Sequence, residues 1–305
     1  MSIHRLTRLT VGVPDVAATE AYYEEFGLAA LGGGRFGTVD GGEQLRIVHA
    51  DVRRAVEVGV GVDDPDDLDR IVANLAALEV TAERVGDELV AVEQFTGVRV
   101  RVSVADRIVQ QAPEQAVYNG PGYTHRANQR AVALTRSEDY LKPRKLGHVV
   151  LGSTNQAASQ DFFVKGLGFK ISDLIKDAGG FLRCSTDHHN LLVVQAPGQL
   201  LHHTSWQLPD VDAVGQAALN MIEAEEGRDA WGLGRHYVGS NFFWYLKDPV
   251  GNFTEYYADM DVIDDDTSWY PQIWEGQESH YKWSPPRRMN MKPQDLAAAM
   301  VGAHS

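Results

Sequence analysis

The sequence predicts an α+β protein made of four βαβββ-like units, which pair into two domains. The first observation is an internal repeat, because the opening segment LTRLTVGVPDVAATEAYYEEFG aligns with LGHVVLGSTNQAASQDFFVKGLG from Leu146. The second is a further pair of similar segments, which begin at Val56 and His202. The third is the length of 305 residues, which allows about two domains of roughly 150 residues each.

Each unit is justified by its hydrophobic pattern. The first and third units predict a short strand, a turn and an amphipathic helix that starts near Val16 or Gln156. Gly27 and Gly168 follow these helices, and each is expected to end its helix in a left-handed conformation. The second and fourth units predict an alternating strand, an Asp/Pro-rich helix start and a helix. Strand-like segments follow, so each unit predicts one helix among several strands.

The predicted domain boundaries follow from these units. Residues 1–130 form an N-terminal non-catalytic domain of two units plus a linker, residues 144–262 form a C-terminal metal-binding domain, and residues 263–305 form a tail rich in aromatics and proline. The stretch between the domains is polar and lacks a hydrophobic period, which is typical of a linker. Aromatic residues in a tail indicate that it packs onto the body or onto a neighbouring subunit.

Composition excludes several classes of protein. Lys plus Arg is 28 and Asp plus Glu is 42, so the formal net charge is −14 and argues against nucleic acid or an anionic membrane as a partner. Apolar residues make up 44% and charged residues 23%, as in ordinary globular chains. One cysteine, Cys184, excludes an internal disulfide. The start MSIHRLTRL lacks the apolar core of a signal peptide, so we expect a cytoplasmic protein.

Two histidines and a glutamate carry the chemistry. His148 lies in strand-like LGHVVLG, His203 in HHTSWQL and Glu255 in NFTEYYAD. If the units pair around a cupped sheet, equivalent inward positions converge on a common centre. Two histidines and one carboxylate are the ligand set of a non-haem Fe(II) site that leaves positions open for substrate and dioxygen, and Mn(II) accepts the same ligands. His202 is expected to point the opposite way, because side chains alternate along a strand.

Four segments of the C-terminal half then carry a family resemblance. They are LGHVVL, TDHHNLLV, HHTSWQL and GRHYVGSNFFWYLKDPVGNFTEYY, the last with RH, SN, a tyrosine, a DPxG turn and EY in order. This ordered set resembles the type I extradiol ring-cleaving dioxygenases of the vicinal oxygen chelate superfamily. The resemblance covers the whole chain in organisation and residues 146–258 at the level of motifs. It implies that His148, His203 and Glu255 hold Fe(II).

The resemblance also implies catalytic residues. Tyr245 would hydrogen-bond a hydroxyl oxygen of a catechol, and His236 would position the same oxygen. His189 matches the acid–base histidine of the family, whose ordinary pKa suits proton transfer near neutral pH. His188 is the competing candidate, and His189 is preferred because a single residue separates it from the apolar strand LLVV.

The repeat also predicts where metal is absent. Overlaying the units places Arg8 opposite His148 and Arg101 roughly opposite Glu255, and cations cannot ligate iron. The first half is therefore expected to hold no metal, as the resemblance also implies. Lyases and isomerases of the superfamily often use a fourth side-chain ligand. That position falls near Val193, where no carboxylate stands, although nearby Gln195 keeps this alternative open.

The pocket wall is expected to be apolar and aromatic. The candidate wall residues are Phe181, Trp206, Trp231 and Phe243. The segment DAWGLGRH before His236 holds no cation except Arg235, which favours a neutral catechol unless a tail residue such as Arg287 enters the site.

The function expected from the sequence is an Fe(II)-dependent extradiol dioxygenase that takes a catechol and dioxygen, in a homo-oligomer. The alternatives are another divalent-metal lyase or isomerase of the superfamily, and a non-catalytic ligand-binding protein of this fold.

Overall fold

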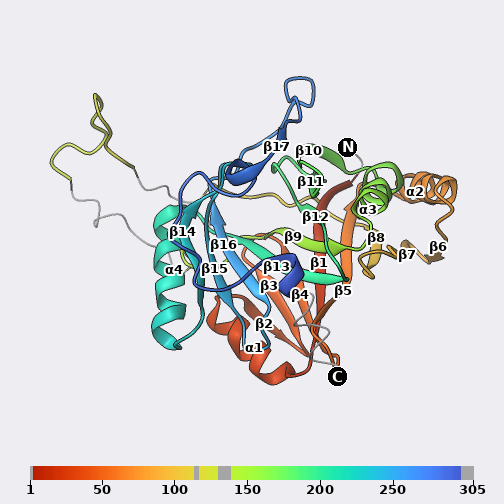
Figure 1. Cartoon of the computed structure of the whole chain (residues 1–305), viewed down its shortest axis with the longest axis horizontal. Coiled ribbons are helices and arrows are strands. Elements are labelled where there is room, and N and C mark those ends of the chain that lie inside the picture. Colours follow the sequence, from red (N-terminus) through yellow and green to blue (C-terminus); the bar gives the residue numbers. More distant parts are fainter. Residues whose placement is uncertain (1–2, 113–116, 130–138, 297–305) are drawn as a thin grey trace.

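The computed structural model describes residues 3–112, 117–129 and 139–296, and its strands form two large mixed sheets (Figure 1). The prediction of four βαβββ units is confirmed, because each unit contributes one helical segment and four strands. None of the helices in the described residues is long and apolar enough to cross a membrane.

The first sheet holds the first two units, in the order β2-β3-β4-β1-β5-β8-β7-β6. Strands β1 and β5 lie side by side at its centre and run antiparallel. Its strands are β1 (Ile3–Val13), β2 (Ala29–Gly32), β3 (Arg35–Thr38), β4 (Gly42–His49), β5 (Arg54–Val62), β6 (Ala82–Val85), β7 (Glu88–Val92) and β8 (Arg99–Val104).

The second sheet repeats this topology with the last two units, in the order β14-β15-β16-β13-β9-β12-β11-β10-β17. Strands β9 and β13 are the central antiparallel pair, equivalent to β1 and β5. Its strands are β9 (Leu146–Ser153), β10 (Lys170–Ile175), β11 (Gly179–Arg183), β12 (Leu191–Gln195), β13 (Leu200–Gln207), β14 (Asp229–Arg235), β15 (Phe242–Lys247), β16 (Phe253–Ala258) and β17 (Ile273–Trp274). The tail supplies β17, which the sequence did not predict.

The helices begin and end where local sequence directs. Asp15, Asp64, Asn155 and Asp210 cap α1 (Val16–Glu25), α2 (Pro65–Ala77), α3 (Gln156–Asp161) and α4 (Val211–Ala224), each accepting a hydrogen bond from a backbone N–H of the first turn. α3 continues as the π-helix η2 (Phe162–Leu167), and a 3₁₀ turn η3 (Gly276–Ser279) lies in the tail. Gly27 (φ 96°) and Gly168 (φ 92°) confirm the predicted left-handed ends.

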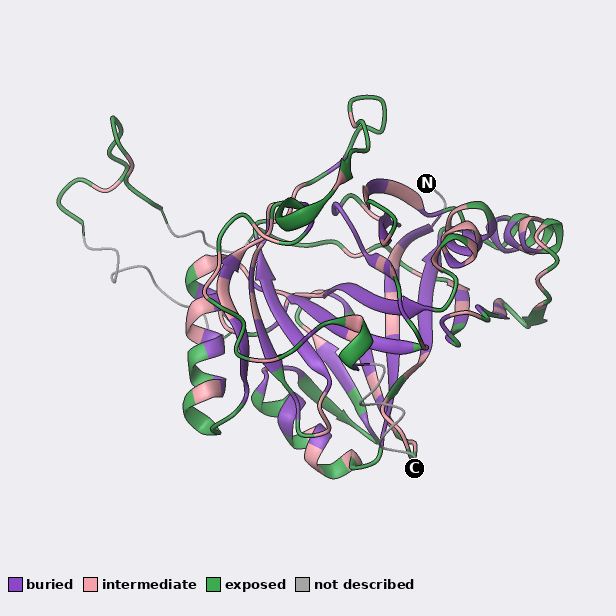
Figure 2. Cartoon of the chain, viewed as in Figure 1, coloured by how far each residue is buried: buried purple, intermediate pink, exposed green. Residues whose placement is uncertain are grey.

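The two halves share one hydrophobic core. Figure 2 shows the central strands buried, whereas α1 and α4 expose their outer faces. Phe26, which directly follows α1, stacks on Tyr256 from β16 with ring centroids 4.0 Å apart. On the opposite side α2 packs on η2, where a Cβ on Gly166 would lie 2.6 Å from Leu75. Because each half buries apolar surface of the other, we expect them to unfold together.

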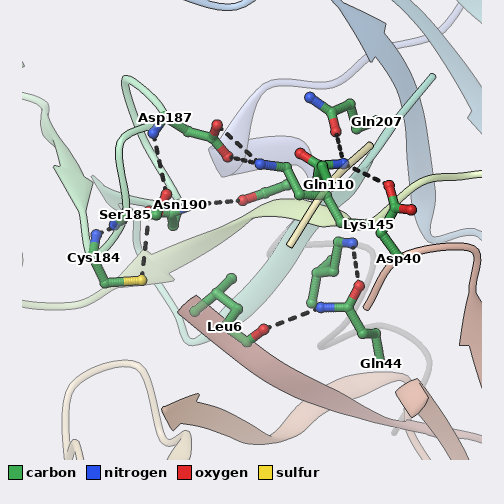
Figure 3. Close-up of polar contacts among 12 residues, drawn as sticks. Leu6, Asp40, Gln44, Gln110, Lys145, Cys184, Ser185, Asp187, Asn190 and Gln207 are labelled. Carbon is green, nitrogen blue, oxygen red and sulfur yellow. Dashed lines mark hydrogen bonds and ion pairs between the residues drawn. The ribbon is translucent and has the colours of Figure 1, made fainter. Parts of the chain in front are cut away.

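A buried amide also joins the halves. The Gln44 side chain donates to the carbonyl of Leu6 and accepts from the backbone N–H of Leu146, linking the first sheet to the start of β9 (Figure 3). This link fixes the strand that carries His148 relative to the first half.

Candidate active site

A cavity of about 180 Å³ lies between the second sheet and the tail. Three predicted catalytic residues, His189, His236 and Tyr245, line it together with His148 and His203. Most of its remaining wall comes from the sheet and the tail, and consists of Val150, Ile175, Phe181, Leu192, Val194, His202, Trp231, Val238, Ser279, His280, Arg287, Met291, Lys292 and Pro293. The cavity is therefore largely apolar, with imidazoles at one end and cations from the tail.

Three side chains converge beside this cavity. The Nε2 atoms of His148 and His203 lie 3.3 Å apart, and the Oε2 atom of Glu255 lies 3.0 Å and 3.5 Å from them. These atoms form the cluster of possible metal ligands found in the described residues. With metal–ligand bonds of about 2.1 Å, neighbouring ligands are about 3.0 Å apart in an octahedron and about 3.4 Å apart in a tetrahedron. The triangle therefore has the size that a divalent cation requires.

The strand register explains this convergence. Ser205 of β13 pairs with His148 of β9 on one side and with Glu255 of β16 on the other. His203 precedes Ser205 by two positions, so its side chain shares the same face. Three adjacent strands thus bring one ligand each to a single patch of the sheet.

The chemistry of these groups fits a cation. Glu255 is fully buried and its Oε2 accepts no hydrogen bond, an arrangement that is costly without a positive partner. Burial would raise the pKa of the Glu255 carboxyl, but His148 and His203 hold it well below the usual value. Burial also lowers the pKa of His203 to about 4, so this imidazole is neutral at pH 7, as a ligand must be.

Neighbouring groups orient these ligands. The Nδ1 atom of His203 lies 2.7 Å from Nδ1 of His202, whose Nε2 lies 2.7 Å from the carbonyl oxygen of Met291. A carbonyl can only accept, so His202 donates from Nε2 and accepts from His203 at Nδ1. This leaves Nε2 of His203 bare toward the centre. Asn241 donates to Oε1 of Glu255 at 3.3 Å.

His202 does not point away from the site, and that expectation is wrong. A register shift between Leu201 and His203 makes a β-bulge at His202. A bulge breaks strict alternation, so adjacent side chains can reach the same side of a strand. His202 and His203 consequently both line the cavity.

Tyr245 and His236 form a hydrogen-bonded pair at one side of the cluster. Nδ1 of His236 donates to the carbonyl of His280, so Nε2 accepts from the Tyr245 hydroxyl at 3.0 Å. Burial raises the pKa of Tyr245 well above its usual value near 10, and Glu255 adds to the effect. Tyr245 therefore stays protonated and acts through hydrogen bonds. Phe243 stacks on His236 from behind, with ring centroids 4.1 Å apart.

His189 lies beside the cluster, and His188 lies behind it. The ring centroid of His189 is 4.3 Å from that of His148, whereas His188 is fully buried against Asp173. Burial lowers the pKa of His189 well below 6.5, and His148 lowers it further, so the ring is neutral. This geometry supports the choice of His189 over His188 as the residue that reaches a bound substrate.

Some expectations for the wall hold and others do not. Phe181 and Trp231 line the cavity as expected. Trp206 does not, because it packs in the core against Tyr23 of α1 and Phe26. Phe243 does not line the cavity either, because it packs against Trp231 and His236. Sequence reasoning missed His280, Met291 and Lys292, since the tail has no periodic pattern that would aim its residues at the sheet.

The position of a fourth ligand carries no metal-binding side chain. Leu192 and Val194 are the residues of β12 that face the cavity. Val193 is buried in the core, and the Gln195 side chain bonds the backbone of Gln156 and Thr154 outside the cavity. This arrangement agrees with three protein ligands instead of four.

The first half carries an ion network at the equivalent positions. Gly59 of β5 pairs with Arg8 of β1 and Arg101 of β8, as Ser205 pairs with His148 and Glu255 in the second half. Glu57 lies seven residues before the helix cap Asp64, as His203 lies seven before Asp210. The Glu57 carboxylate accepts from Arg8 at 3.2 Å and Arg101 at 3.0 Å. An Arg–Glu–Arg set thus replaces a His–His–Glu set.

The repeated βαβββ units and the convergent His–His–Glu cluster define the class: a protein of vicinal oxygen chelate fold with a candidate metal centre. Residues 145–256 match the model of the Glyoxalase/Bleomycin resistance protein/Dioxygenase superfamily. The chain is similar to Metapyrocatechase 2 of Cupriavidus necator, with 29% identity over 93% of this chain and 90% of that protein. It is 29% identical to 3-methylcatechol 2,3-dioxygenase of Pseudomonas putida over 65% of this chain and 68% of that protein. The chain thus resembles the type I extradiol ring-cleaving dioxygenases of this superfamily, and the matched residues include His148, His203 and Glu255.

Solved structures agree on the fold. The Mn(II)-bound glyoxalase from Novosphingobium aromaticivorans superimposes with a TM-score of 0.76 at 21% identity, over 94% of this chain and 93% of that chain. The 2,2',3-trihydroxybiphenyl 1,2-dioxygenase from Sphingomonas wittichii superimposes with a TM-score of 0.73 at 18% identity, over 94% of this chain and 100% of that chain.

Proposed function

We propose that the protein is an Fe(II)-dependent dioxygenase that cleaves a catechol ring with dioxygen, at the carbon–carbon bond beside the two hydroxyls. The observation that carries this proposal is the triangle of His148, His203 and Glu255 beside an apolar cavity. Three ligands leave positions free for both catechol oxygens and for dioxygen. The similarity to proteins named metapyrocatechase and 3-methylcatechol 2,3-dioxygenase supports the same substrate class.

In this proposal His148, His203 and Glu255 hold the metal. The cation, when bound, would acidify the catechol hydroxyls and overcome the spin barrier that keeps dioxygen unreactive toward organic molecules. The other residues bind and orient the substrate, and they move protons. Fe(II) is proposed because it can donate an electron to this chemistry. Mn(II) accepts the same ligands, and one similar protein is named as manganese-dependent.

Tyr245 and His236 would hold one hydroxyl oxygen of the catechol. Because the Tyr245 hydroxyl hydrogen points to His236, the lone pairs of Tyr245 are free to accept a hydrogen bond from the substrate. The high pKa of Tyr245 keeps this hydroxyl uncharged, so the pair orients the ring without competing for its proton.

His189 would take a proton from the reacting substrate and return one later. Its neutral state provides a free nitrogen, and its place beside His148 puts it next to the metal position. Phe181 packs on His189 at 5.0 Å and limits the access of water.

The size and lining of the cavity favour a small single-ring catechol. A volume of about 180 Å³ lies below the roughly 300–1,000 Å³ typical of sites for drug-sized ligands. The expectation of a neutral substrate rested on the absence of a cation before His236. Arg287 lines the cavity and lies 4.3 Å above the Trp231 ring, so a screen must include a catechol with a carboxylate side chain.

The test is anaerobic loading with Fe(II) or Mn(II), followed by oxygen uptake with unsubstituted, alkyl and carboxylated catechols. We expect stoichiometric oxygen uptake and a yellow ring-opened product that carries a carboxylate and an aldehyde or ketone. A colourless dicarboxylic muconate would contradict the proposed cleavage position. Metal-dependent turnover without oxygen uptake would instead indicate a lyase or isomerase, and binding without turnover would indicate a ligand-binding protein.

The domain boundaries, the assembly and the cellular location also belong to this proposal. We propose a catalytic domain of residues 144–262, a homo-oligomer and a cytoplasmic enzyme. Light scattering of the purified chain and fractionation of its host cells test the last two.

A further inference from the structure

The site contains two pairs of adjacent histidines that are built alike. In each pair the Nδ1 atoms face each other: 2.7 Å separate His202 from His203, and 3.1 Å separate His188 from His189. In each pair the second histidine reaches the metal cluster or its edge, and the first lies farther back. The role of the first histidine can therefore be worked out from what it contacts at its other nitrogen.

For His188 that contact is a carboxylate. Its Nε2 lies 3.1 Å from Oδ2 of Asp173, whose Oδ1 accepts from the backbone N–H of Gln272 at 2.6 Å. A carboxylate only accepts, so the hydrogen of a neutral His188 sits on Nε2. Nδ1 of His188 then carries a lone pair and accepts the hydrogen on Nδ1 of His189. Nε2 of His189 is left without a hydrogen.

The chain of contacts is shielded from water. Asp173, His188 and His189 are 3%, 0% and 4% exposed. The Trp269 ring meets His188 at 5.4 Å and Phe181 meets both imidazoles. In such surroundings a misdirected hydrogen bond cannot be replaced by water, so each donor and acceptor has one satisfactory arrangement.

The loop that carries the pair is also clamped to the strand of a metal ligand. The Asn190 side chain accepts from the backbone N–H groups of Cys184 and Ser185 (Figure 3). It donates to the carbonyl of Gly147, the residue before His148. The distance between His189 and the metal cluster is therefore fixed by the backbone, and the direction of its hydrogen remains to be set by side chains.

We propose that Asp173 and His188 are positioning residues that lock His189 in the tautomer with hydrogen on Nδ1, so that its bare Nε2 faces the substrate. This inference rests on the proposed role of His189 in proton transfer. It assigns a function to two buried polar residues that are neither metal ligands nor part of the cavity wall. It also explains the His-His doublet, because the first histidine aims the second.

Replacing Asp173 by asparagine should reverse the direction of each hydrogen bond between residue 173, His188 and His189. The single oxygen of the amide is retained by the backbone N–H of Gln272, so the amide NH₂ faces His188. His188 must then accept at Nε2 and carry its hydrogen on Nδ1, which forces the hydrogen of His189 onto Nε2. The variant therefore presents a donor where the wild type presents an acceptor, with little change in shape.

The first measurement is the histidine tautomer by NMR. Selective ¹⁵N-histidine labelling of the zinc-substituted, diamagnetic enzyme distinguishes hydrogen on Nδ1 from hydrogen on Nε2. We expect the Nδ1–H form of His189 in the wild type and its loss in Asp173→Asn. The same Nδ1–H form in both proteins would overturn the proposal, whether or not the enzyme cleaves catechols.

The second measurement is turnover of the iron enzyme. Second-layer partners typically matter about 10- to 100-fold, so kcat should fall by that factor in Asp173→Asn and His188→Phe, with iron content and anaerobic catechol Kd unchanged. Because Asp173 acts through His188, the double variant should be no slower than His188→Phe alone. Additive losses of kcat in the double variant would contradict the inference that Asp173 acts through His188.

A matched control distinguishes the effect of the Asp173–His188–His189 hydrogen-bond chain from a general loss of stability. Asp187 is a buried carboxylate on the same loop that pairs with Lys145 and not with a histidine. Asp187→Asn should leave the His189 tautomer and kcat near wild type. An equal loss of kcat in Asp187→Asn would mean that the loop, not the hydrogen-bond chain, is responsible. Complete absence of ring cleavage in the wild type would defeat the proposed function but leave the NMR result standing.

Discussion

Replacing His202 by leucine should weaken metal binding although His202 is not a ligand. The wild-type His202 accepts the Nδ1 hydrogen of His203, which keeps Nε2 of His203 bare and aimed at the centre. In the metal-free variant His203 can shift its hydrogen to Nε2 or rotate to find a new partner. Binding must reverse that change and bury an N–H with no acceptor.

Two estimates of the metal-binding free energy lost in His202→Leu agree. A buried donor left without a partner costs about 1–3 kcal/mol. Loss of a hydrogen bond behind a ligating histidine typically lowers metal affinity about 10- to 100-fold, which is about 1.4–2.7 kcal/mol. We therefore expect the Kd for Fe(II) to rise by one to two orders of magnitude in His202→Leu.

The assay is an anaerobic titration of metal against a competing chelator. His202→Asn should restore most of the affinity, because its amide oxygen takes the place of Nδ1. His4→Leu is the matched control, since His4 is a buried histidine of β1 in the other sheet. Unchanged affinity in His202→Leu, beside lost affinity in His203→Ala, would refute the reasoning.

Three further predictions concern activity, metal content and stability. His189→Ala should keep iron and anaerobic catechol binding while kcat falls about 10²- to 10⁴-fold, whereas Glu255→Ala should lose the metal; iron analysis and oxygen uptake distinguish them. Glu57→Gln should leave one metal per chain. It should lower the free energy of unfolding by about 2 kcal/mol, because Arg8 and Arg101 lose a shared partner. A change in metal content would contradict the assignment of the metal site to the second half. Burial raises the pKa of Asp248 to about 6, so the fold favours its protonated form and stability is lost as pH rises from 3.8 to about 6. Relative to that of Asp248→Asn, the free energy of unfolding of the wild type should fall by up to about 3 kcal/mol between pH 4 and pH 7, as measured by urea unfolding. Parallel profiles of this free energy against pH in the two proteins would show that the carboxyl does not titrate in this range.

The repeat and the motifs predicted the fold and the converging side chains, because both are consequences of strand order and register. Alternation along β13 predicted the wrong direction for the His202 side chain, because a single β-bulge reverses that direction. The amino-acid sequence around the bulge does not reveal it. The tail was expected to pack back, but not where. Its backbone carbonyls at His280 and Met291 orient His236 and His202, and a carbonyl contact is independent of residue type.

Trp206 shows a second limit. An aromatic residue on a central strand can face the cavity or the helices, and its neighbours Ser205 and Gln207 do not decide between the two. The outcome was decided by Tyr23 of α1 and by Phe26, which follows this helix, because both come from the other half of the chain and fill the opposite face. A contact between residues so far apart in sequence leaves no local pattern to interpret.

The Arg–Glu–Arg set of the first half has an evolutionary consequence. Between the halves, two imidazoles correspond to an arginine and a glutamate, and a carboxylate corresponds to an arginine, so every position differs in charge. A single substitution does not create a metal site there, because at least one arginine would remain beside Glu57 and repel an incoming cation. The charges at these positions thus oppose metal binding in the first half, and new metal-dependent activities are expected to arise by variation around the second half and its tail.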